Sequence, residues 1–136
     1  MLRFEERNHS LFVIEFDKIG LKDLIKSIVE LPKRQILEII DDGKIKFLEI
    51  VEIKAEGYHG NFFRKEKELL IEMTKEDIEN FLDLLTEYEK TDKYAAHELL
   101  EVKFKKRTKS IIISYVTIEY LSYLSKIVER WENVVY

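Results

Sequence analysis

The chain of 136 residues contains no cysteine, one proline and four glycines. Without cysteine it can form no disulfide bond, no thiolate metal site and no thiol nucleophile. No uninterrupted apolar run is longer than a few residues, and charged side chains already stand among the first seven residues. We therefore expect no signal peptide, no membrane-spanning helix and a cytoplasmic location.

The residues that are present have the composition of a folded domain with a highly charged surface. Apolar residues make up 46% of the chain and charged residues 37%. A chain of this length buries roughly two thirds of its unfolded surface around one core, so we expect a single domain over residues 1–136. The formal net charge of −4 disfavours nucleic acid as a partner of the molecule as a whole.

Strand and helix periodicities alternate along the chain. Segments 11–31, 69–88 and 111–131 each begin with a two-residue period and continue with a helical one. Further strand patterns precede each segment, and Asp42-Gly43 predicts a tight hairpin turn. A change of apolar parity between Phe47 and Leu48 predicts a β-bulge or a bend. The predicted order is ββα-βββα-ββα. The predicted fold is an α+β two-layer sandwich, a mainly antiparallel sheet of about 6–7 strands with three helices on one face.

The helix predicted after Thr74 carries a row of carboxylates on one exposed face, formed by Glu76, Glu79, Asp83 and Glu87. Like charges four residues apart destabilise a helix by roughly 0.2–0.5 kcal/mol per pair, so helix stability alone does not explain the row. Lysines of neighbouring strands could neutralise these carboxylates, or the row could serve solubility. The alternative is a patch that binds a protein partner with a basic surface.

The helix predicted in the third segment is apolar on two sides. One stripe is expected to pack on the sheet, and the second consists of Tyr120, Tyr123, Ile127 and Val134. This second stripe either packs under a neighbouring helix or forms an interface between copies of the chain, because tyrosine is enriched at interfaces. The second of these alternatives predicts a homo-oligomer.

Residues that could carry chemistry are sparse. His9, His59 and His97 lack the spacing that would place two imidazoles on one metal ion, and we expect no metal and no cofactor. Two glycines in segment 57–61 flank Tyr58 and His59, where backbone could approach a ligand, although glycine serves ordinary turns in the same way. No catalytic motif is evident, which favours a protein that is not an enzyme.

A basic stretch lies at the tip of a predicted hairpin and consists of Lys103, Lys105, Lys106, Arg107 and Lys109. It would contact a phosphate backbone, or it would protect a hairpin edge from aggregation. The favoured hypothesis is a non-catalytic protein-binding module that uses the acidic helix face, by analogy of class with immunity and inhibitor proteins. The alternatives are a small-ligand binder or enzyme with a pocket near His59, and a nucleic-acid binder through Lys103–Lys109.

Overall fold

The computed structural model describes residues 1–8, 10–54 and 60–123. In chain order the elements are β1 (Leu2–Asn8), β2 (Leu11–Phe16), α1 (Lys18–Val29), β3 (Ile36–Asp41), β4 (Lys44–Ile53), β5 (Gly60–Arg64), β6 (Glu68–Thr74), α2 (Lys75–Thr91), β7 (Ala96–Phe104) and β8 (Arg107–Tyr115). A helical segment begins at residue 118 and reaches residue 123, the last residue that the structure describes. Within the described residues, no helix is long and apolar enough to cross a membrane.

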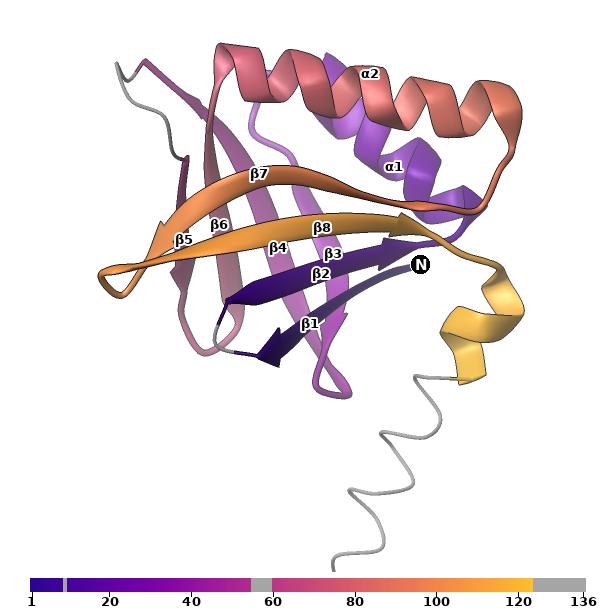
Figure 1. Ribbon diagram of the computed structural model, residues 1–136, viewed down its shortest axis with the longest axis horizontal. Coiled ribbons are helices and arrows are strands. Elements are labelled where there is room, and N and C mark those ends of the chain that lie inside the picture. The colour runs from indigo at the N-terminus through magenta and orange to yellow at the C-terminus, as the bar shows by residue number, and fades with distance from the viewer. Residues whose placement is uncertain (9, 55–59, 124–136) are drawn as a thin grey trace, which may run out of the picture.

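The eight strands form a closed barrel in the order β1-β2-β8-β7-β5-β6-β4-β3, with β3 pairing back to β1. Each hairpin is antiparallel, and the four remaining pairings are parallel. Odd-numbered strands therefore all run one way and even-numbered strands the other. As a result, the hairpin turns gather at one end of the barrel, and α1 and α2 contact each other at the opposite end (Figure 1).

The closed barrel shows that the predicted two-layer sandwich was wrong. Parallel pairings between strands far apart in the sequence, such as β2 with β8 and β4 with β6, close the sheet and remove its edges. The helices lie over an end of this barrel instead of covering a flat face. Strand periodicity reports which side of a strand is apolar, but not which strands become neighbours, so the sequence pattern could not reveal this closure.

From β1 to β8 the chain forms two copies of a hairpin–helix–hairpin unit, β1–β4 and β5–β8. The predicted order ββα-βββα-ββα therefore lacked one strand between the first two helices. The strand pairings of the two copies have the same register. The pair of Phe12 in β2 with Ile111 in β8 corresponds to the pair of Leu69 in β6 with Leu48 in β4. The residues before the two helices, Asp17 and Thr74, both act as N-caps. The equivalent positions used below are Phe4 and Phe62, Glu6 and Arg64, Asp41 and Phe104, Asp42 and Lys105, Gly43 and Lys106, and Lys46 and Lys109.

The core fills the barrel from the helices to the hairpin end. Leu24 of α1 and Phe81 of α2 are both fully buried, and they close the helix end of the core. In the middle of the barrel the equivalent residues Phe4 and Phe62 stack with their ring centroids 5.5 Å apart. Burial of each such side chain contributes about 1.5–3 kcal/mol to stability.

The bulge predicted near Phe47 is also wrong, because β4 pairs with β3 and β6 without an irregularity. Phe47 and Ile45 lie on the outer surface, 40% and 62% exposed. The interior position between them belongs to Lys46, which bonds Asp41 of β3. A charged residue facing inward thus gave the appearance of a shift in apolar parity.

Candidate functional site: the charged mouth of the barrel

Inward-facing charged side chains close the hairpin end of the barrel, which we call the mouth. Five strands carry a buried apolar residue and, two positions nearer the hairpin end, a charged one. Side chains two positions apart in a strand point the same way, so these charged residues also face inward. They are Glu6, Asp41, Lys46, Arg64 and Lys109, and the apolar residues are Phe4, Ile39, Leu48, Phe62 and Ile111. The side chains of Asp41 and Lys109 are only 4% and 6% exposed. Charges buried to this extent require partners, and each of these five has one.

The five charges form one continuous chain of ion pairs. The Oδ2 atom of Asp41 accepts hydrogen bonds from Lys46 Nζ and Arg64 Nη2, both at 2.7 Å. The Nη1 atom of Arg64 donates to Glu6 Oε2 at 3.0 Å, and Lys109 Nζ donates to Glu6 Oε1 at 2.7 Å. Glu6 and Arg64 occupy equivalent positions in the two halves, so the central ion pair joins the two copies of the unit.

Aromatic rings form the floor beneath these charges. The Nζ atom of Lys109 lies 4.5 Å from the centroid of the Phe12 ring and 5.2 Å from that of Phe104. The guanidinium carbon of Arg64 lies 5.7 Å from the centroid of the Phe4 ring. Ring faces attract cations at such distances, so the floor holds both cationic groups at the mouth.

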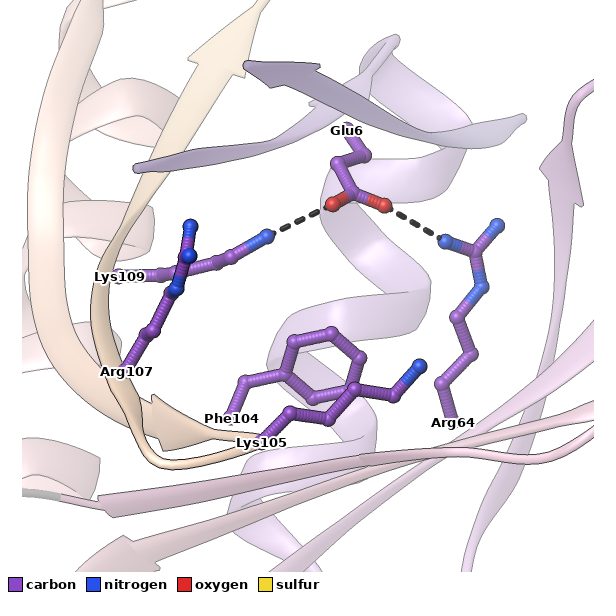
Figure 2. Close-up of a pocket in the computed structure, with 6 residues that line it drawn as sticks. All are labelled: Glu6, Arg64, Phe104, Lys105, Arg107 and Lys109. Carbon is purple, nitrogen blue, oxygen red and sulfur yellow. Dashed lines mark hydrogen bonds and ion pairs between the residues drawn. The ribbon is translucent and has the colours of Figure 1, made fainter. Parts of the chain in front are cut away.

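A cavity of about 290 Å³ opens at this mouth, lined by Glu6, Arg64, Phe104, Lys105, Arg107 and Lys109; we call it the cationic recess. Figure 2 shows Lys109 and Arg64 reaching the Glu6 carboxylate from opposite sides. The hydrogen bond from Lys109, helped by the charges of Lys109 and Arg64, lowers the pKa of Glu6 although partial burial acts in the opposite direction. Lys105 and Arg107 make no ion pair with any described residue. The recess thus holds four cationic side chains and one carboxylate.

A second cavity, of about 420 Å³, shares Glu6 and Arg64 with the cationic recess; we call it the acidic recess. Its lining includes Glu5, Asp41 and Asp42 together with Glu6 and Arg64. Asp41 and Asp42 are the first-half equivalents of Phe104 and Lys105. The two recesses therefore occupy corresponding places in the two halves but have opposite charge.

The two-residue turns beside these recesses share a backbone conformation but not a sequence. Asp42 and Gly43 have φ values of 54° and 74°, and Lys105 and Lys106 have 47° and 66°. Asp-Gly is a favoured pair for such left-handed hairpin turns. A side chain with a Cβ atom in this region costs roughly 1–2 kcal/mol per residue, and lysine lacks the local hydrogen bonds that relieve aspartate and asparagine. The Lys105-Lys106 turn therefore contains two lysine residues in a backbone conformation that is unfavourable for their side chains.

The acidic residues predicted from the sequence lie far from this mouth. Glu76, Glu79, Asp83 and Glu87 are all exposed on α2, at the helix end of the barrel (Figure 1). None of the four forms an ion pair within the part of the chain that the structure describes. Neutralisation by lysines of neighbouring strands is thus not seen there, and the binding role of the row stays a prediction.

The other predicted residues are divided between the described and the undescribed parts of the chain. Tyr120 and Tyr123 are 47% and 62% exposed, whereas Ile127 and Val134 lie outside the described residues. His59 and Tyr58 lie outside them too, so a pocket near His59 stays untested. His97 belongs to β7 and lies beside Tyr88 of α2.

The Nδ1 atom of His97 is 2.6 Å from the hydroxyl of Tyr88. Burial raises the pKa of Tyr88 to about 12. Burial also raises the pKa of Tyr115, whose hydroxyl donates to Asp92. These tyrosines thus remain protonated and pack against Phe16 beneath the helix end.

Sequence reasoning found part of the cationic recess and missed the rest. Lys105, Arg107 and Lys109 belong to the basic stretch recognised in the sequence, but Glu6 and Arg64 come from strands distant in the chain. The available signal was a charged residue at an inward position of an otherwise apolar strand. At Lys46 this signal was present and was interpreted as a bulge.

No protein-family model matches the chain, and a search of curated proteins finds no match either. Within the described residues, no group of three or more histidine, aspartate or glutamate side chains is placed to hold a metal ion.

Proposed function

We propose that the protein is a non-catalytic binding protein whose ligand presents a phosphate group to the cationic recess. The convergence of Arg64, Lys105, Arg107 and Lys109 on one cavity carries this proposal. A phosphate would replace the Glu6 carboxylate at Lys109 and Arg64 and would also meet Lys105 and Arg107, which have no carboxylate partner among the described residues. Guanidinium and ammonium groups together suit a phosphate, since charge-assisted hydrogen bonds are the strong ones.

The electrostatics of Glu6 support binding over acid–base catalysis. Its lowered pKa keeps the carboxylate ionised at neutral pH, so it is a poor proton donor. In the unliganded protein it serves as the counter-ion of Lys109 and Arg64. A ligand anion must displace it, which selects ligands with more negative charge than one carboxylate.

Calorimetric titration with pyrophosphate, comparing two lysine variants, tests the proposal. Lys109 and Lys46 are equivalent, both face inward, and each bonds one carboxylate, so Lys46→Met is a matched control for Lys109→Met. We expect pyrophosphate to bind the wild-type protein and Lys109→Met to weaken binding about 10-fold or more, as for loss of a hydrogen bond to a charged group. Lys46→Met should leave affinity within about twofold. Absent binding, or equal losses in the two variants, would contradict the proposal.

A second candidate is binding of a basic protein partner by the acidic face of α2, and its exposed carboxylates favour it. This is the immunity- or inhibitor-type function, exercised by Glu76, Glu79, Asp83 and Glu87. Replacing Glu79 and Asp83 by lysine should abolish capture of such a partner. Unchanged capture by that variant would remove this candidate.

Two further expectations stay proposals. Tyr120 and Tyr123 provide exposed aromatic surface for an interface between copies of the chain. Sedimentation of the wild type against Tyr120→Ser with Tyr123→Ser would reveal such an interface as a loss of the larger species. A cytoplasmic location fits a chain without cysteine.

A further inference from the structure

Two lysines of the β7–β8 hairpin stand outside the cationic recess. Lys106 lies at the tip of the hairpin and Lys103 on the outer face of β7, and both are exposed. Neither lines the recess, so a small anion seated there would not need them. Their charges extend the cationic surface from the recess over the hairpin.

We propose that the phosphate-bearing ligand is a single-stranded nucleic acid, with one phosphate in the cationic recess and its neighbours along Lys103 and Lys106. This inference rests on the function proposed above and deepens it. A strand that leaves the recess passes the tip of the hairpin, where these lysines meet the next phosphates. A positively charged groove that follows a backbone is the usual means of binding single strands.

The left-handed turn supports a ligand that extends beyond the recess. The equivalent turn, Asp42-Gly43, shows residues that this backbone favours, whereas Lys105-Lys106 keeps side chains that it disfavours. Local strain that persists is typical of functional sites. The charge at Lys106 is useful only to a ligand that reaches the tip, because this side chain is not part of the recess lining.

An exposed aromatic ring beside the hairpin favours a single strand over a duplex. Phe63 of β5 is 48% exposed, and its strand pairs in parallel with β7 through Asn61 and Lys103. Phe63 and Lys103 therefore lie on the same outer surface of the barrel. Unpaired bases stack on such rings whatever their identity, while the bases of a duplex are already stacked.

The charge distribution of the whole molecule agrees with this site despite its net charge of −4. Exposed carboxylates of α2 lie at the helix end, and the basic hairpin lies at the other (Figure 1). The α2 carboxylates repel a polyanion from the helix end, and the acidic recess repels it from the first half of the mouth, so attraction is confined to the cationic recess and the β7–β8 hairpin.

Fluorescence anisotropy with single strands of about 2, 4, 8 and 12 nucleotides tests the inference, because single-strand sites commonly span ~4–16 nucleotides. Affinity should rise with length and then level off, and log affinity against log salt should have a slope of about −2 for roughly three phosphate contacts. If pyrophosphate binds but affinity does not depend on strand length, the nucleic-acid inference fails and the proposed function stands. If pyrophosphate does not bind, the proposed function itself fails.

Charge variants at the two ends of the molecule provide a matched comparison. Lys103→Gln with Lys106→Gly should weaken binding of the 12-nucleotide strand about 10-fold and make the salt slope shallower by about 1.4, while pyrophosphate affinity stays unchanged. The control, Lys90→Gln with Lys93→Gln, removes the same charge near the end of α2 and should change neither. Equal losses in the two double variants would overturn the inference.

Phe63→Ala tests the choice of a single strand. It should weaken binding of the single strand about fivefold or more through lost stacking, and leave binding of a duplex of equal length unchanged. Wild-type binding of that duplex as tightly as the single strand would overturn the assignment. RNA and DNA strands of the same sequence, titrated in parallel, identify which of the two is preferred.

Discussion

The two halves of the barrel have the same backbone plan but opposite charge at the mouth. In the first half Asp41 and Asp42 precede the glycine of a favourable turn, and Asp41 neutralises both Lys46 and Arg64. In the second half the corresponding positions hold Phe104 and Lys105, and Lys105 forms a disfavoured turn with Lys106. The first half thus stabilises the mouth, while the second leaves positive charge available to a ligand.

If the proposed phosphate site is correct, the two halves divide stability and binding between them. Corresponding residues experience the same strand register, so differences between the halves do not arise from the backbone plan. In the second half, unlike the first, the turn consists of two exposed lysines, Lys105 and Lys106, in a strained backbone conformation. We infer that binding, not folding, accounts for these departures.

Removing the counter-ion of the first half should have the largest effect. Asp41→Ala leaves Lys46 without its carboxylate in a buried place and leaves Arg64 only Glu6, so the free energy of unfolding should fall by about 3–5 kcal/mol. Urea denaturation measures this change. Glu6→Ala is the control, because Glu6 is 37% exposed and its loss should be smaller. A loss no greater than that of the control would contradict the role assigned to Asp41.

Of the two helix N-caps, the one in the first half should contribute more to the free energy of unfolding. Asp17 is buried, accepts from Gly20 N at 2.9 Å, and pairs with the Met1 ammonium at 2.7 Å. Thr74 is half-buried and accepts from Asp77 N at 3.3 Å. We expect Asp17→Ala to lower stability by about 2 kcal/mol and Thr74→Ala by about 1 kcal/mol, measured by thermal or urea unfolding. Equal losses would show that the cap environments are equivalent.

Exchange of the turn residues should sharpen the contrast between the halves. Lys105→Asp with Lys106→Gly introduces the first-half turn and should raise stability by about 1–2 kcal/mol while weakening pyrophosphate binding. At the equivalent of Lys106 in the first half, Gly43→Lys should lower stability by about 1 kcal/mol and leave pyrophosphate binding unchanged. Denaturation and calorimetry measure the two properties. A turn exchange that left both unaltered would refute the separation of stability from binding.

The smallest effect concerns the pH dependence of Glu6. Its pKa in the folded protein is lower than the ordinary value of 4.5, so its contribution to stability is present above about that pH and is lost as pH falls through the folded pKa. Glu6→Gln should therefore show a shallower decline of stability with acid than the wild type. Protonation of Glu6 also frees Lys109 and Arg64, so the variant should bind pyrophosphate more tightly at neutral pH. Urea midpoints measured across the acid range, together with calorimetry, check both outcomes.

Local features of the fold were readable from particular residues. The start of a helix after Thr74 and a hairpin turn at Asp42-Gly43 are both predicted from the sequence and confirmed. Each feature depends on residues within a few positions of one another, where side-chain hydrogen bonds and φ preferences act directly. The basic stretch at Lys103–Lys109 was visible for the same reason, because it is continuous in the chain.

The charged mouth could be predicted only in part. Glu6 and Arg64 are 58 residues apart in the chain, and their hydrogen bond exists only because the barrel closes. The inward position of Lys46 could not be predicted, because a lysine is stable there only through its ion pair with Asp41 of the neighbouring strand. Pairing partners of this kind follow from tertiary register, which strand periodicity does not contain.

The sequence by itself determined the local elements: the strands, the helix caps, the Asp-Gly turn, the acidic row of α2 and the basic stretch of the β7–β8 hairpin. These depend on short-range preferences of neighbouring residues. Tertiary structure alone decided that the sheet closes, that one unit occurs twice, and that the two halves of the mouth end with opposite charge. Closure requires parallel pairing between distant strands, so the charge left at the mouth is settled by which side chains the barrel brings together.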